Sequence, residues 1–121
     1  MHQSIINLKT IDKQINDKIS DEVNVKKVNI VAVSKTFKIT DIEPMIKFGH
    51  THFGENKVQE ALEKWSDIKV NNKNVKLHLI GKLQTNKVKF VLPLFDYIHS
   101  LDSIRLAEKI SNEQSKKNFR P

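Results

Sequence analysis

Two lysines of this chain stand where a lysine amine could react with a carbonyl compound. Lys35 comes after the mostly apolar run 28–33, and Lys82 comes after a second apolar run at 77–80. An amine at the mouth of a buried strand can be removed from water, which lowers an amine's pKa and frees it to attack an aldehyde. The chain has 21 lysine and arginine residues. Position in the sequence therefore makes both Lys35 and Lys82 candidates and does not distinguish between them.

The elements that must position these lysines alternate between strand and helix. Apolar runs of strand length are predicted at 25–34, 50–54, 75–80 and 97–100. Helical spacing of apolar residues predicts an opening helix at 8–19 and later helices at 41–48, 57–68, 84–92 and 102–110. This alternation is typical of βα units and a parallel sheet.

Two architectures fit this order of elements. One is a doubly wound sheet, and the other is part of a (β/α)8 barrel of the TIM type, with four βα units preceded by a helix. The chain has only Gly49, Gly54 and Gly81, so the glycine-rich fingerprint of dinucleotide-binding sheets is absent. That absence weakens the nucleotide-binding alternative.

Local signals predict where several helices begin and end. Thr40 with Glu43 resembles a capping box, Asn56 is expected to cap the helix at 57–68, and Asp102 or Ser103 is expected to start the last helix. The polar segment 111–121 is expected to be a frayed tail.

Composition indicates one α/β domain over residues 1–121 and a cytosolic protein. No apolar stretch approaches the roughly 20 residues that a membrane span needs, and no signal-peptide pattern is found near Met1. The chain has no cysteine, and its net charge is +7. The basic residues are spread along the whole chain and only Arg105 and Arg120 are arginine, so specific nucleic-acid binding is not expected.

Polar residues gather where the predicted strands end. These positions are 34–36, 54–56, 81–84 and 100–102. In both architectures the functional site lies at the carboxyl ends of the strands. Each of these residues, including Asn56 and Asp102, could instead serve only as a turn or a helix cap.

Four ordered motifs resemble the pyridoxal phosphate homeostasis protein family. They are VAVSKT at 31–36, FGENKVQE at 53–60, HLIGKLQTNK at 78–87 and IHSLDS at 98–103. The resemblance implies a barrel of the alanine-racemase N-terminal type that holds pyridoxal 5′-phosphate (PLP) as a Schiff base on the lysine after the first strand. That lysine corresponds to Lys35, so the resemblance favours Lys35 over Lys82 as the reactive lysine.

The resemblance also implies a set of cofactor-binding residues. Asn56 is expected against the cofactor ring, and Gly81, Gln84 and Ser100 are expected to line the strand ends around it. His78 is expected to pack inside the strand layer. No residue is expected to be catalytic, and no metal site is expected. His50 and His52 alternate onto one strand face, but no carboxylate or cysteine stands at a suitable spacing for a metal.

One departure from the family concerns length. Family members continue through four further βα units, whose loops hold the cofactor phosphate, whereas this sequence stops at Pro121. The resemblance therefore implies the N-terminal half of a barrel, with weakened PLP binding. Open sheet edges are expected to recruit a second copy or a separate C-terminal half.

Three functions are weighed. The first is an intracellular PLP carrier in PLP homeostasis, without catalytic turnover. The second is a PLP-dependent amino-acid racemase-like enzyme, which would need a second acid–base residue, whereas the sole tyrosine, Tyr97, stands early in a predicted strand. The third is a non-functional fragment of a split gene.

Overall fold

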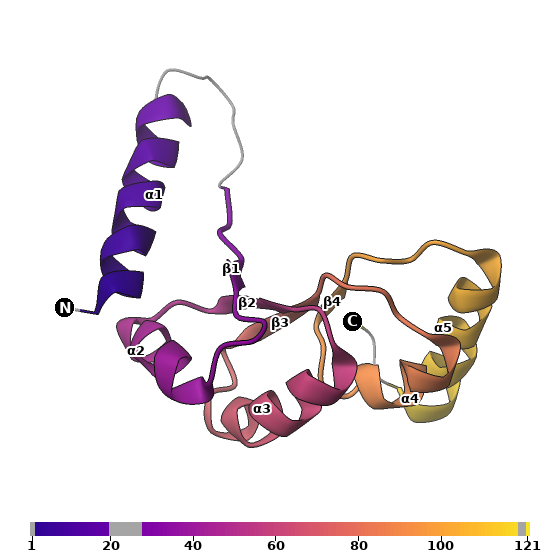
Figure 1. Ribbon diagram of the computed structural model, residues 1–121. Helices are drawn as coiled ribbons and strands as arrows, with labels where there is room; N and C mark the ends of the chain where they lie inside the picture. The colour runs from indigo at the N-terminus through magenta and orange to yellow at the C-terminus, as the bar shows by residue number, and fades with distance from the viewer. Residues whose placement is uncertain (1, 20–27, 119–120) are drawn as a thin grey trace.

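The computed structural model describes residues 2–19, 28–118 and 121 of the chain (Figure 1). The elements follow one another as α1 (Gln3–Ile19), β1 (Ala32–Val33), α2 (Ile39–Phe48), β2 (His52–Glu55), α3 (Val58–Asn71), β3 (Lys76–Leu79), the 3-10 turn η1 (Thr85–Lys87), α4 (Val88–Val91), β4 (Tyr97–Ile98) and α5 (Ile104–Lys117). The alternation of strand and helix predicted from the sequence is confirmed.

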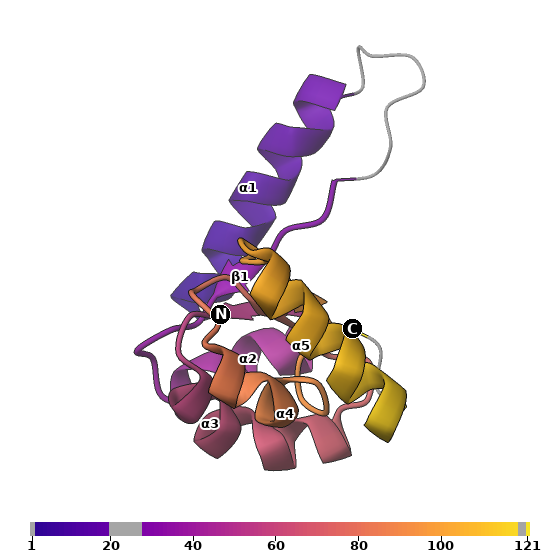
Figure 2. The same ribbon diagram turned by 90° about the vertical axis from the view of Figure 1, so that its right-hand side faces the viewer.

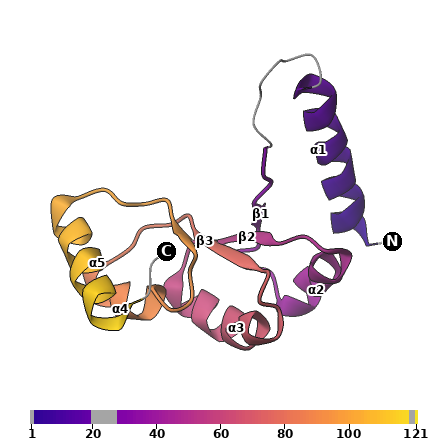
Figure 3. The same cartoon turned by 180° about the vertical axis from the view of Figure 1, so that it is seen from behind.

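The four strands form one parallel sheet in the order β1-β2-β3-β4. The register pairs Val33 with Gly54, Gly54 with His78, and His78 with Tyr97. Helices α2 and α3 lie along one side of the sheet in Figures 1 and 3, while α1 projects from its β1 end. Parallel strands in chain order, with helices on one side, form part of a barrel, and the predicted fold class is confirmed.

The hydrophobic core fills the space between the sheet and these helices. Phe53 points to this side and contacts Trp65 of α3, with ring centroids 5.0 Å apart. Both side chains are fully buried, together with Ala61, Leu77, Leu79, Val88 and Val91. Ala61 and Trp65 stand one turn apart on α3, so the helix presents a continuous apolar stripe to the strands. Strand alternation then turns His52, Gly54 and His78 to the opposite side of the sheet.

The predicted N-terminal caps of two helices are wrong. Helix α2 begins at Ile39, two residues before the predicted start, so Thr40 and Glu43 stand inside it and do not form a capping box. Helix α3 begins at Val58, and Lys57, not Asn56, occupies the capping position. Neither helix has a side-chain cap, and backbone geometry alone sets the two starts.

Two other predicted helix ends are confirmed. Gly49 ends α2 in the left-handed conformation at φ 105°, and its N–H donates to the carbonyls of both Ile46 and Met45. The hydroxyl of Ser103 caps α5 by accepting a hydrogen bond from the amide of Leu106. The alternative start at Asp102 is thereby excluded.

The first strand and the last helix differ most from expectation. Of the predicted strand 25–34, only Ala32 and Val33 pair as a strand, while 28–31 do not, and 25–27 lie outside the described residues. The predicted frayed tail is wrong over 111–117, because α5 continues to Lys117 and buries Glu113. Glu113 pairs with Lys109 at 3.2 Å, which supports this extra helix length.

Helix α1 contacts α2 near its beginning and extends away from the other helices. Figure 2 shows it rising away from the layer that holds α2 to α5. Only Ile5 and Leu8, near its beginning, are buried, and Ile11 is exposed. None of the helices in the described part of the chain is long and apolar enough to cross a membrane.

Candidate functional site

The five predicted site residues all lie near the carboxyl edge of the sheet. Lys35 stands two residues after β1, Asn56 directly follows β2, Gly81 and Gln84 follow β3, and Ser100 follows β4. Because the strands are parallel and adjacent, these loops lie side by side along one edge. The topology therefore gathers the residue set at the end of the sheet where ligands bind in such folds.

Lys35 has a free amine within the described residues. Its side chain is exposed, and no hydrogen bond or ion pair engages its Nζ atom among residues 2–19, 28–118 and 121. The side chain of Lys64, on α3, is in contrast only 8% exposed and pairs with Glu55 and Glu60. The amine of Lys35 is thus accessible at this edge, whereas that of Lys64 is engaged.

Gly81 and Asn56 come into close contact. An ideal Cβ atom built on Gly81 would collide with the backbone carbonyl of Asn56. The loops after β2 and β3 can approach this closely only because residue 81 has no side chain. This role in packing the two loops is sufficient reason for a glycine at this position.

Asn56 and Gln84 line one cavity of about 230 Å³. Three lysines, the exposed Lys57 and Lys82 and the half-buried Lys87, line the same cavity and make it basic. Lys35 and Ser100 do not line it. The structure therefore brings two of the predicted site residues together in a shared cavity and places the others elsewhere along the edge.

Ser100 carries an unsatisfied polar atom. Its hydroxyl oxygen is buried and has no hydrogen-bond partner within the described residues. Buried hydroxyls are normally satisfied, and exceptions are found where a ligand or water completes them. Ser100 thus offers a donor and an acceptor at the end of β4.

The loop that carries Lys35 has an unusual backbone conformation. Thr36 has φ 68°, in the left-handed region that a β-branched residue enters at a cost of about 1–2 kcal/mol. Its amide donates a hydrogen bond of 2.6 Å to Oε1 of Glu60 on α3. This hydrogen bond is the main cause that lowers the pKa of the Glu60 carboxyl, and Lys64 lowers it further.

A buried polar network lies beneath the same loop. Glu55 at the end of β2 is buried, and its Oε1 atom lies 2.7 Å from Nζ of Lys64. Its Oε2 atom accepts a 3.0 Å hydrogen bond from the hydroxyl of Ser34. Sequence reasoning placed Glu55 at a strand end but missed this network. The sequence did hold a signal, because Glu55 follows the alternation of β2 onto its helix-facing side and Lys64 lies nearly two turns inside α3.

Three histidines form a hydrogen-bonded row on the side of the sheet opposite the helices. Nδ1 of His52 lies 2.9 Å from Nε2 of His78, and Nδ1 of His78 lies 2.9 Å from Nε2 of His99. Tyr97 stacks on His78 with ring centroids 4.3 Å apart. Burial is the main cause that lowers the pKa of His78 to about 4, and the neighbouring His52 and His99 add to it. Sequence reasoning placed His78 in the strand layer but missed the row, which depends on the register of three strands.

The row has no metal-binding geometry. No group of three histidine, aspartate or glutamate side chains in the described part of the chain could hold a metal ion. Both ring nitrogens of His78 are engaged with the other two histidines, which leaves no lone pair on it for a cation.

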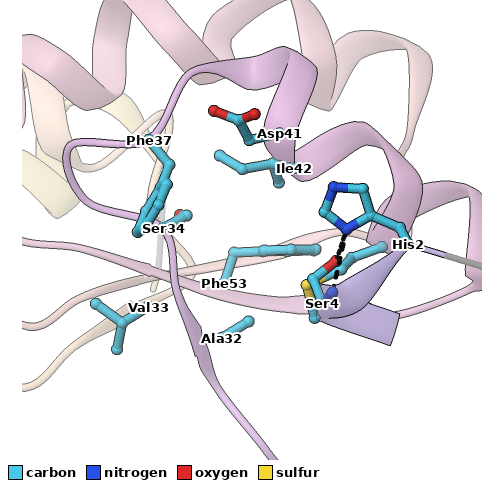
Figure 4. A pocket seen from close by; sticks show the side chains of 10 residues that line it. His2, Ser4, Ala32, Val33, Ser34, Phe37, Asp41, Ile42 and Phe53 are labelled. Atoms are coloured by element: carbon cyan, nitrogen blue, oxygen red, sulfur yellow. Dashed lines mark hydrogen bonds between the residues drawn. The ribbon is translucent and has the colours of Figure 1, made fainter. Parts of the chain in front are cut away.

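A second cavity, of about 300 Å³, lies between the start of α1, β1 and α2 (Figure 4). Its lining is mostly apolar and includes Ile42, Phe37 and Phe53. At its α1 end, the imidazole of His2 and the hydroxyl of Ser4 lie 2.6 Å apart. Lys35 does not line this cavity, so it is separate from the strand-end residues.

The fold and the strand-end residues define a class: part of a parallel βα barrel with a free lysine amine after its first strand. No protein-family model matches the chain. Among curated proteins, the pyridoxal phosphate homeostasis protein of Buchnera aphidicola (from Schizaphis graminum) is 36% identical over 120 residues, covering 98% of this chain and 52% of that protein. The Haemophilus influenzae protein of the same name is 38% identical over 116 residues, covering 95% of this chain and 48% of its own length.

Solved structures also match this chain over about half of their own length. PipY of Synechococcus elongatus without PLP superposes with a TM-score of 0.74 at 34% identity, covering 92% of this chain and 50% of PipY. PipY with PLP bound superposes with a TM-score of 0.71 at 34% identity, covering 89% of this chain and 50% of PipY. The chain spans about half the length of the relatives that it matches. It belongs, over that half, to the pyridoxal phosphate homeostasis protein family.

Proposed function

We propose that this chain binds PLP through Lys35 and acts in PLP homeostasis as part of a barrel. The observation that carries the proposal is the free amine of Lys35 in the loop after β1, at the carboxyl edge of a parallel sheet. The names of the curated relatives and the PLP-bound structure of PipY support the choice of ligand.

The donor set at this edge fits such a ligand. When bound, PLP supplies an aldehyde that can condense with a lysine amine with loss of water. Lys35 would provide the amine, and the buried hydroxyl of Ser100 would provide a hydrogen-bonding partner at the end of β4. Asn56 and Gln84 would present amide groups from their shared cavity, and Gly81 would keep the loops in close contact.

We further propose that the protein holds its ligand without catalytic turnover. The relatives are named for homeostasis of pyridoxal phosphate. A racemase-like reaction would need a second acid–base group beside the lysine. Tyr97 stacks on His78 at the beginning of β4, away from the carboxyl edge, so no observation favours the racemase-like alternative.

The remaining expectations stay predictions. They are a single domain over 1–121 that forms half of a barrel, a cytosolic location and the absence of a specific nucleic-acid partner. The expected protein partner, a second copy or a separate C-terminal half, is supported by the two outer strands, each of which pairs on one side only within the described residues.

The test compares Lys35→Ala with Lys82→Ala, because sequence position nominated both lysines. Each purified protein is incubated with PLP, dialysed, reduced with borohydride and digested for peptide mass mapping. We expect one dominant PLP-modified peptide containing residue 35 in the unsubstituted protein and in Lys82→Ala, and none in Lys35→Ala. Modification spread evenly over the surface lysines would overturn the proposal.

A further inference from the structure

Two backbone groups that flank Lys35 are held by side chains of one helix. Nζ of Lys64 donates a hydrogen bond of 2.7 Å to the carbonyl of Ser34, the residue before Lys35. Oε1 of Glu60 accepts the 2.6 Å hydrogen bond from the amide of Thr36, the residue after it. Glu60 and Lys64 stand one turn apart on α3 and pair with each other at 3.3 Å.

Lys64 is itself fixed by burial. The side chains of Lys64 and Glu55 are only 8% and 1% exposed, and their charged atoms lie 2.7 Å apart. A buried charge is costly without its partner, so neither side chain can leave this geometry freely. The hydroxyl of Ser34 donates to the same carboxylate of Glu55. The helix, the end of β2 and the loop after β1 are thus joined by one polar network.

The network also explains why Thr36 keeps its left-handed conformation. A threonine held at φ 68° relaxes unless its surroundings fix it. The carboxylate of Glu60 supplies that restraint through a charge-assisted hydrogen bond to the Thr36 amide. The backbone on both sides of Lys35 is therefore held in place, while the Lys35 side chain itself stays exposed.

We propose that Glu60 and Lys64 are positioning residues for Lys35, which fix its backbone so that the amine meets a PLP aldehyde from one direction. This role rests on the proposed function of Lys35. Neither side chain needs to touch the ligand, because each acts through the backbone of Ser34 or Thr36. A shift of this loop by an ångström would misalign the amine, and such misplacement is costly to reaction rates.

The test uses Glu60→Ala, Glu60→Gln and the matched control Glu63→Ala. Glu63 lies on the same helix, and its one hydrogen bond within the described residues is accepted from exposed Gln59. The first readout needs no ligand: hydrogen exchange of the Thr36 amide, followed by NMR. The second is the rate at which PLP with cyanoborohydride labels Lys35, measured by peptide mass mapping with Lys82 as the internal reference.

We expect Glu60→Ala to speed exchange of the Thr36 amide at least about tenfold, because its acceptor is lost. Labelling of Lys35 should slow about tenfold while that of Lys82 stays constant. Glu60→Gln keeps an oxygen acceptor, so it should restore part of both effects. Glu63→Ala should match the unsubstituted protein.

The outcomes separate the two proposals. If the unsubstituted protein labels Lys35 no faster than Lys82, the proposed function fails and the positioning role fails with it. If the unsubstituted protein prefers Lys35 but Glu60→Ala labels it at the same rate, only the positioning role is overturned. An equal loss in Glu63→Ala would also overturn it, because a general weakening of α3 would then explain the result.

Discussion

At the scale of single residues, the environment of His78 ties the stability of this protein to pH. Its ring is buried between His52 and His99 and stacked on Tyr97. Burial and the two neighbouring rings disfavour a proton on His78, and only Asp96 favours one. The fold therefore prefers a neutral His78.

The first prediction at this scale concerns acid. The pKa of His78 falls from 6.5 in an unfolded chain to about 4 in the fold, so the unfolded state binds the proton first. The stability that a neutral His78 contributes is therefore complete only well above pH 6.5 and is lost as the pH falls toward 4, by on the order of 2 kcal/mol between pH 7 and pH 5. Urea unfolding at several pH values measures this loss.

The matched variant is His78→Phe, which keeps a stacked ring and cannot take a proton. Its stability at pH 7 should be lower, because His52 and His99 lose a partner. Its loss of stability between pH 7 and pH 5 should nevertheless be smaller than that of the unsubstituted protein. Equal pH slopes for the two proteins would refute the assignment to His78, and His50, whose pKa burial also lowers, would then be examined.

At the scale of elements, the register of neighbouring strands decides what the sequence could and could not predict. Helices and strands were predictable where apolar residues kept a clear period, as in α3 with Val58, Ala61 and Trp65. The caps of α2 and α3 were predicted wrongly, because no side chain caps either helix. Neither could the histidine row nor the pairing of Glu55 with Lys64 be predicted, since both need the spatial alignment of segments far apart in the chain.

For the five predicted site residues, the sequence predicted the location but not the contacts. Their common location at the carboxyl edge followed from the order of strands and helices, since parallel strands end at one edge. Their mutual contacts did not follow from it. Only the loop geometry shows that Gly81 touches the Asn56 backbone and that Gln84 shares a cavity with Asn56.

The contact between the loops after β2 and β3 gives a prediction at this scale. Gly81→Ala should lower the free energy of unfolding by about 1–3 kcal/mol, because a methyl group must displace the Asn56 backbone. Gly49→Ala is the control: its Cβ atom would meet open space, so only the left-handed backbone at φ 105° costs it about 1 kcal/mol. Urea midpoints measure both changes. A Gly81→Ala protein no less stable than Gly49→Ala would contradict the close approach.

At the scale of the whole molecule, the two outer strands of the sheet carry exposed apolar side chains on the same side. Val33 in β1 and Tyr97 in β4 are 48% and 47% exposed, and the register places both on the side that carries the histidine row. Leu101 and Ile104, which follow β4, are also exposed. Uncovered apolar side chains beside unpaired strand edges favour association with another polypeptide.

We therefore expect the isolated chain to associate. Its sedimentation coefficient should rise with protein concentration, and the double variant Val33→Lys, Tyr97→Lys should reduce that rise, because charged side chains discourage edge-to-edge pairing. The control pair Ile11→Lys, Val70→Lys changes two exposed apolar residues on helices and should leave the association unchanged. A sharp monomer peak at every concentration, with cooperative melting, would contradict this expectation.

The order β1-β2-β3-β4 has one more consequence, for the way in which this fold is assembled. Each strand pairs with the strand that precedes it in the chain, so every new βα unit docks on a surface that has already been synthesised. No strand has to wait for a distant partner, and the entropy of closing a long loop is not incurred within this sheet. The sheet can therefore grow one unit at a time as the chain leaves the ribosome. The loop that carries Lys35 is held in place once α3 has been synthesised, because Glu60 and Lys64 of α3 bond to its backbone.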